Sequence, residues 1–140
     1  MRLIKKIINL FLSQVDEEHP ISTQSKRDIR FESIKANVSN GVNKPIEMSE
    51  DEEMFIKELI LRIDATHDNY NLSFERLSDK TFNVWYNSYY LGKIKLQGKD
   101  TYMQILYGTH GANAVRECNL NEYIKHIDSW IERIKFLDTI

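Results

Sequence analysis

The feature that most constrains the fold is a change of hydrophobic period near residue 70. Apolar and polar side chains then alternate in runs rich in β-branched and aromatic residues, which is the pattern of half-buried strands. Short polar segments interrupt these runs at residues 78–80, 87–89 and 97–100. Connections this short join antiparallel neighbours. The sequence therefore predicts an antiparallel β-meander of about four strands over residues 71–107.

The register of these strands follows from the requirement that one face of the sheet be apolar. We pair Tyr86 with Tyr90, because a slip by one residue would put Lys93 on the core face. Pairing Leu96 with Thr101 continues the same face into the last strand. The apolar face then carries Phe82, Val84, Ile94, Met103 and Ile105. Such a pattern is typical of a sheet that is covered on one side only.

Two amphipathic helices flank the alternating region. Residues 49–66 begin with Ser49 and Glu52 in the spacing of a capping box and continue with apolar side chains at helical spacing. Residues 120–137 follow a natural N-cap, Asn119, and carry a wide apolar stripe. We expect the second of these helices to cover the apolar sheet face, which makes the fold class α+β.

The N-terminal third of the chain is less regular. Residues 1–19 have apolar side chains at helical spacing and predict an amphipathic helix, which could pack in the core, form a homodimer or lie on an anionic membrane. Residues 20–47 are polar and indicate either a linker or a short helix over about 25–38. We expect the α+β domain itself to span residues 48–140.

Composition restricts the classes of function. The net charge of −2 favours neither nucleic acid nor membrane, and no apolar run is long enough to predict a transmembrane segment. The single cysteine, Cys118, excludes an intrachain disulfide and a cysteine-rich zinc site. The four histidines lack the spacing of metal ligands. We therefore expect a cytoplasmic protein with no metal and no cofactor; abundant Ile and Asn are typical of low-GC bacterial or phage genomes.

The second face of the predicted sheet is the main candidate for a binding site. Its predicted binding residues are Trp85, Lys93, Lys95, Tyr102 and Gln104, and the same face also carries Asn83, Leu91 and Leu106. Aromatic side chains between lysines can anchor a protein partner. They can equally stack on bases while the lysines contact phosphates.

A second candidate site is His110, which lies between two glycines after the last predicted strand, in a segment expected to be a loop. A loop histidine can act as a general base, and Cys118 could pair with it only if the fold brings the two together. The sequence contains no phosphate-binding loop and no nucleophile elbow. Our hypothesis is a non-enzymatic binding or regulatory protein that contacts a protein partner; the alternative is a nucleic-acid-binding module.

Overall fold

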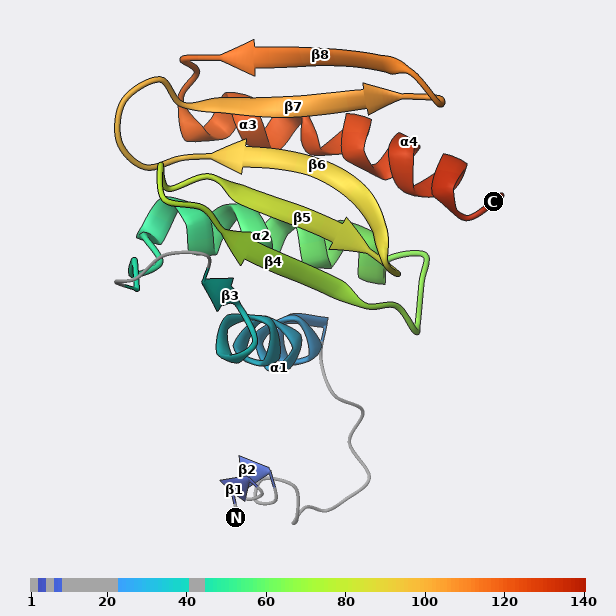
Figure 1. The fold of residues 1–140 in the computed structure, drawn as a ribbon. Coiled ribbons are helices and arrows are strands. Elements are labelled where there is room, and N and C mark those ends of the chain that lie inside the picture. The colour runs from blue at the N-terminus through green and yellow to red at the C-terminus, as the bar shows by residue number, and fades with distance from the viewer. Residues whose placement is uncertain (1–2, 5–6, 9–22, 41–44) are drawn as a thin grey trace.

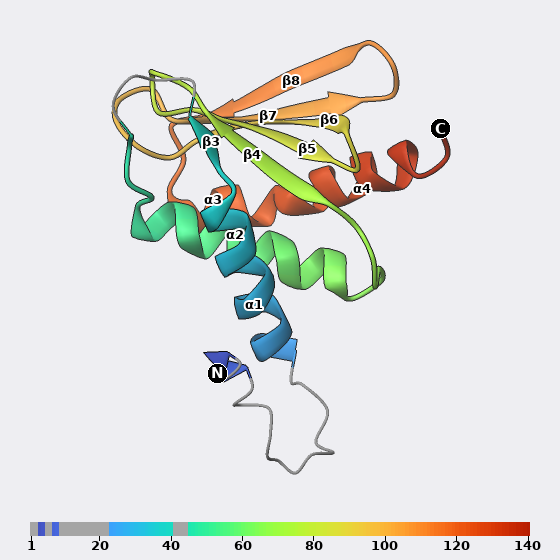
Figure 2. The same cartoon turned by 60° about the horizontal axis from the view of Figure 1, so that its bottom comes forward.

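The computed structural model describes residues 3–4, 7–8, 23–40 and 45–140. It confirms the α+β class, with helices on one face of a six-stranded mixed sheet (Figures 1 and 2). The helices are α1 (Thr23–Ala36), α2 (Glu50–Asp64), α3 (Leu120–Lys125) and α4 (Ile127–Leu137). In order across the sheet the strands are β3 (Ser39–Asn40), β4 (Leu72–Arg76), β5 (Phe82–Tyr86), β6 (Tyr89–Lys95), β7 (Tyr102–Tyr107) and β8 (Gly111–Arg116).

The sheet is larger than the predicted meander of about four strands, so the predicted number of strands is not confirmed. Strands β4 to β8 are antiparallel neighbours, and β3 pairs in parallel with β4. Strand β8 occupies the segment that was expected to be a loop. Its residues are mostly small or polar, so it lacks the apolar alternation from which the other strands were predicted.

The N-terminal helix predicted over residues 1–19 is not confirmed. Of that segment the structure describes only β1 (Leu3–Ile4) and β2 (Ile7–Ile8), which pair in parallel. The rest of the segment, with any dimer contact it makes, lies outside the described residues. The following polar segment contains α1, which packs against α2 and buries Phe31 and Ile34. No helix in the described part of the chain is long and apolar enough to cross a membrane.

The core lies between the sheet and the helices. The five side chains predicted for the apolar face are all buried: Phe82, Val84, Ile94, Met103 and Ile105. Helix α4 packs against β6 and β7, as expected of the C-terminal helix. Its Trp130 is fully buried and meets Phe55 of α2 edge-on, with ring centroids 5.7 Å apart. Each large side chain buried in this way contributes about 1.5–3 kcal/mol.

The register at the β5–β6 turn differs by one residue from the prediction. Tyr86 pairs with Tyr89 and not with Tyr90. Between the paired residues, Asn87 and Ser88 have φ angles of 48° and 73°. Two successive residues with positive φ make the tight two-residue turn whose twist matches that of the flanking strands. The geometry of the turn therefore decides the pairing at this end of the hairpin.

A β-bulge reconciles this tight turn with the apolar face. Val84 pairs with Gly92, as predicted, but Trp85 pairs with Tyr90, so Leu91 is an extra residue in β6. The prediction that Leu91 lies on the second face is wrong, because the bulge turns its side chain into the core, where it is fully buried. Tyr90, which the predicted pairing with Tyr86 would put on the core face, lies instead beside Trp85. The bulge thus exchanges an aliphatic for an aromatic side chain on the second face.

The same irregularity opens the ladder between β6 and β7, which share only two residue pairs. The indole N–H of Trp130 donates to the backbone oxygen of Gln104 at 2.7 Å, and so satisfies an acceptor that the ladder leaves free. Gly92 has a φ of 153°, and a Cβ there would lie 3.0 Å from that oxygen and 3.1 Å from the Trp130 ring. Glycine is therefore required at this position.

Candidate functional site

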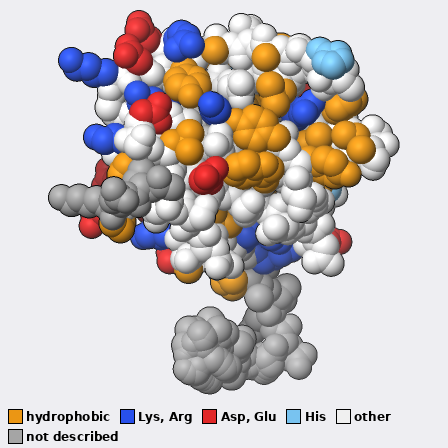
Figure 3. Space-filling model, viewed as in Figure 1, with side chains coloured by type: hydrophobic (Ala, Val, Ile, Leu, Met, Phe, Trp, Pro, Cys, Tyr) orange, Lys and Arg blue, Asp and Glu red, His pale blue; other side chains and the backbone are white. Residues whose placement is uncertain are grey.

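The face of the sheet that points away from the helices is uncovered in the described part of the structure (Figures 2 and 3). We call it the open face. Pairing and burial place on it Ser73, Glu75, Asn83, Trp85, Tyr90, Lys93, Lys95, Tyr102, Gln104, Leu106, Ala112, Ala114 and Arg116. The five residues predicted to bind a partner are all among them, and their role in binding stays a prediction. Figure 3 shows hydrophobic side chains gathered over part of this face, with Lys and Arg around them.

The aromatic part of the open face is held in place by a chain of hydrogen bonds across three strands. The rings of Trp85 and Tyr90 meet edge to face, with centroids 5.5 Å apart. The Tyr90 hydroxyl donates to Asn83 Oδ1 at 2.8 Å, and Asn83 Nδ2 donates to Glu75 Oε1 at 3.2 Å. Burial, together with nearby Tyr102 and Glu75, raises the pKa of Tyr90 to about 12. The hydroxyl therefore stays protonated at neutral pH and keeps its donor role.

The basic part of the open face consists of Lys93, Lys95 and Arg116. Arg116 lies over the ring of Tyr102, with its guanidinium carbon 5.2 Å from the centroid, a cation–π distance. None of the three cations forms an ion pair with any carboxylate of the described residues. The acid on this face is Glu75, and the charge of Lys95 also acts on the nearby Asp79 carboxylate. Three cations against these two acids leave the local charge positive although the whole chain carries −2.

Gln104 lies between these two parts and joins them to the core. Its backbone oxygen accepts from the Trp130 indole, while its side-chain Oε1 is buried and has no hydrogen-bond partner among the described groups. A buried acceptor without a partner costs about 1–3 kcal/mol. The backbone of this residue is therefore fixed, and its side-chain oxygen is shielded from solvent.

His110, the other predicted site residue, stands apart from the open face. It is exposed in the turn between β7 and β8. Cys118 follows the opposite end of β8, where its Sγ donates to the backbone oxygen of Arg116 at 3.4 Å. The fold does not bring His110 and Cys118 together. Within the residues that the structure describes, no group of three or more His, Cys, Asp or Glu side chains could hold a metal ion.

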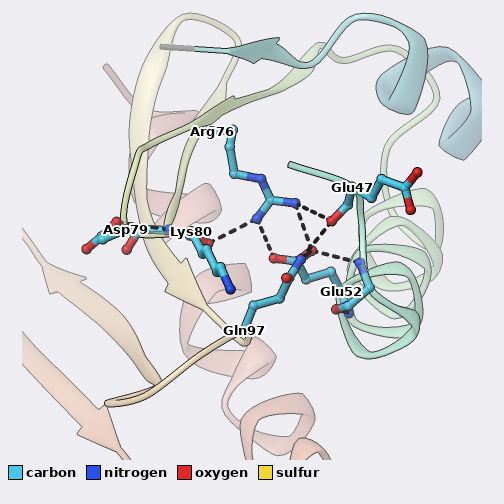
Figure 4. Close-up of polar contacts among 8 residues, drawn as sticks. Glu47, Glu52, Arg76, Asp79, Lys80 and Gln97 are labelled. Atoms are coloured by element: carbon cyan, nitrogen blue, oxygen red, sulfur yellow. Dashed lines mark hydrogen bonds and ion pairs between the residues drawn. The ribbon is translucent and has the colours of Figure 1, made fainter. Parts of the chain in front are cut away.

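Sequence reasoning missed a buried polar cluster at the start of α2 (Figure 4). Arg76 and Glu52 are 1% and 2% exposed, and the guanidinium binds the carboxylate through two hydrogen bonds of 2.6 and 2.9 Å. Gln97 Nε2 and the Ser49 backbone N–H donate to the same carboxylate at 2.7 and 3.0 Å. The Arg76 guanidinium also stacks on Phe82 at 3.9 Å.

This buried cluster joins three separate segments of the chain. The carboxylate of Glu52 accepts four hydrogen bonds, three at Oε1 and one at Oε2. Two sequence signals point to the pair: Glu52 occupies the third position of a capping box, and Arg76 shares the core-facing parity of Leu72 and Phe74. The cluster fixes the helix to the sheet, and the open face remains the candidate site.

No protein family, no curated protein and no solved structure matches this chain.

Proposed function

We propose that this chain is a non-enzymatic binding protein, which recognises an acidic surface of a protein partner with the open face of its sheet. The observation that carries the proposal is the combination, on one uncovered face, of a fixed aromatic pair and three cations without ion-pair partners among the described residues. Interface energy is concentrated in aromatic and arginine side chains.

The arrangement suits binding because little order has to be imposed on it. Trp85 and Tyr90 support each other, and Asn83 fixes the Tyr90 hydroxyl, so their rotamers are set before a partner arrives. Ordering a free side chain at an interface costs about 0.5–1.5 kcal/mol, and this cost is largely avoided here. Lys93 and Lys95 provide positive charge beside the pair, which steers an acidic partner toward it.

A second candidate function, single-stranded nucleic-acid binding, is favoured by one specific observation. Lys93 and Lys95 lie two residues apart in β6, on the same face as Trp85 and Tyr102. The lysines could therefore contact phosphates while the aromatic rings stack on bases. Stacking of a base on an aromatic side chain is worth about 1–3 kcal/mol. We place this candidate second because Glu75 keeps a carboxylate on the same face. A phosphate backbone is charged along its whole length and would meet this carboxylate, whereas a protein partner can place its acidic groups opposite the cations alone.

A pull-down with the full chain as bait, in nuclease-treated lysate, tests the proposal. We expect one stoichiometric protein partner for the natural chain and for the control Lys135→Ala, whose lysine is exposed on α4. The partner should be lost with Trp85→Ala and with Lys93→Ala/Lys95→Ala. A partner retained by both open-face variants would refute the use of this face. Loss of capture after nuclease treatment, together with salt-sensitive oligonucleotide binding, would establish the second candidate instead.

A further inference from the structure

Strand β8 is the last strand of the sheet and is exposed along most of its length. It pairs with β7 over six residue pairs without a register shift, yet every residue but Val115 is exposed. Figure 2 shows β8 extending beyond the helices that cover the rest of the sheet. The strand contains no proline, and its one charge is Arg116. Natural proteins usually protect an edge strand with prolines, charges or bulges, and these devices are nearly absent here.

The hydrogen bonds show which backbone groups of β8 point to this free edge. The N–H of Glu117 donates to the oxygen of Thr101 at 3.0 Å, so these two residues form a pair of the hydrogen-bonded kind. In an antiparallel ladder such pairs alternate with pairs that are not hydrogen-bonded. The backbone groups that point outward therefore belong to Ala112, Ala114 and Arg116.

Two contacts made by side chains agree with this assignment. The N–H of Ala114 donates to Asn113 Oδ1 at 2.8 Å, and the oxygen of Arg116 accepts from Cys118 Sγ at 3.4 Å. Both groups therefore do not bond β7, and each contacts only a side chain of a neighbouring residue. The outward groups of Ala112 have no hydrogen bond of this kind among the described residues.

We propose that a second copy of this chain adds its own β8 to this edge in antiparallel orientation, so that the two sheets of a homodimer become continuous. The alternation of outward groups fixes the register. The two edges bond fully only when Ala114 lies opposite Ala114 of the second copy and Ala112 lies opposite its Arg116. The twofold axis then passes through the Ala114 pair.

The side chains of β8 are compatible with this self-pairing. Opposed like charges destabilise a sheet, but the two Arg116 side chains would lie four residues apart along the strands, or about 14 Å at 3.4 Å per residue. That exceeds the screening length of about 8 Å at physiological salt. The alanines on the axis are small enough to face each other without a clash.

The position of the helices also permits the dimer. Helix α4 packs on β6 and β7, so no helix from either copy has to occupy the space beneath the new strand pair. A twofold axis perpendicular to the sheet would put both open faces on the same side of the dimer. The homodimer contact expected from the N-terminal segment is not needed for this arrangement.

Sedimentation of the full chain from micromolar to millimolar concentration tests the proposal. We expect a reversible monomer–dimer equilibrium that Ala114→Pro abolishes. Proline at this position should be tolerated by the monomer, because the N–H of Ala114 points away from β7. Lys135→Ala, whose lysine is exposed on α4, is the control and should leave the dimerisation constant unchanged. Asn113→Ala removes the competing acceptor and should tighten the dimer several-fold.

A charge exchange at the axis keeps the test decisive if the proline variant fails to fold. Ala114→Lys and Ala114→Glu should each weaken self-association, because each puts like charges opposite one another. An equimolar mixture of these two variants should form a heterodimer. A natural chain that stays monomeric at every concentration, or a dimer that neither proline nor these charges affect, would overturn the proposal.

Discussion

Replacing Glu52 with glutamine should destabilise the protein by about 3–5 kcal/mol, because it leaves the Arg76 guanidinium buried without its counter-charge. The two side chains are almost completely buried, so water cannot take the place of the carboxylate. The Glu52 carboxylate also accepts from Gln97 and from the Ser49 backbone N–H. A glutamine side chain would turn its NH₂ group toward at least one of these donors.

The size of this effect can be compared with the stability of a whole domain, which is typically about 5–15 kcal/mol. The substitution should therefore remove about a fifth or more of the total. For a chain of this length, 1 kcal/mol corresponds to roughly 3–4 °C in the melting temperature, so we expect a decrease of about 10–20 °C. Urea unfolding followed by circular dichroism gives the free-energy change directly.

The neighbouring residue supplies a matched control. Glu53 lies on the same helix and pairs with Lys57 at 2.7 Å, but these side chains are 40% and 25% exposed. Glu53→Gln makes the same chemical change in a solvated ion pair and should cost about 0.5 kcal/mol or less. A loss below about 1 kcal/mol for Glu52→Gln, or equal losses for the two variants, would show that the buried pair does not hold α2 to the sheet.

Two further predictions concern the sheet. Gly92→Ala should cost about 1–3 kcal/mol in urea unfolding, because the new Cβ would crowd Gln104 and Trp130; an unchanged midpoint would contradict the role assigned to the opened ladder. Burial and the hydrogen bond to Asp138 raise the pKa of Tyr86 to about 12. The pKa of Tyr90 is also raised to about 12, and both values lie above the unfolded value of about 10. The stability that these two hydroxyls contribute is therefore complete below pH 10 and is lost as the pH rises from 10 to 12. Tyrosinate absorbance would follow their titration, and urea unfolding at pH 10 and at pH 12 would measure the loss. Titration of both hydroxyls near pH 10 in the folded protein would contradict the assignment.

The helices could be predicted from the sequence because their signals are local. Ser49 and Glu52 form the predicted capping box, and Asn119 caps α3 through the Glu122 N–H at 2.9 Å. The predicted helix over 120–137 is divided at His126 into α3 and α4. Its apolar stripe nevertheless faces the core, because the stripe depends on spacing and not on an unbroken helix.

The rest of the fold depends on turn conformation and on strand pairing, which the pattern of apolar residues does not predict. The alternation of β5 and β6 is compatible with two pairings at their turn, and the conformation of Asn87 and Ser88 selects the one that requires a bulge. Leu91 and Tyr90 exchange faces as a result. Strand β8 has no apolar face, so its pairing with β7 could not be read from hydrophobicity. The open face could be predicted because most of its residues follow from the alternation of side chains between the two faces of each strand.

Binding of a protein partner by the open face can be followed through the indole N–H signals of the two tryptophans in a nitrogen–proton correlation spectrum. Trp85 lies on the open face, whereas the Trp130 N–H is bonded to Gln104 in the core and serves as an internal reference. On addition of the captured partner, we expect the Trp85 signal to shift or broaden while the Trp130 signal stays in place. A bound complex in which the Trp85 signal is unchanged, and only signals from the helices move, would contradict it.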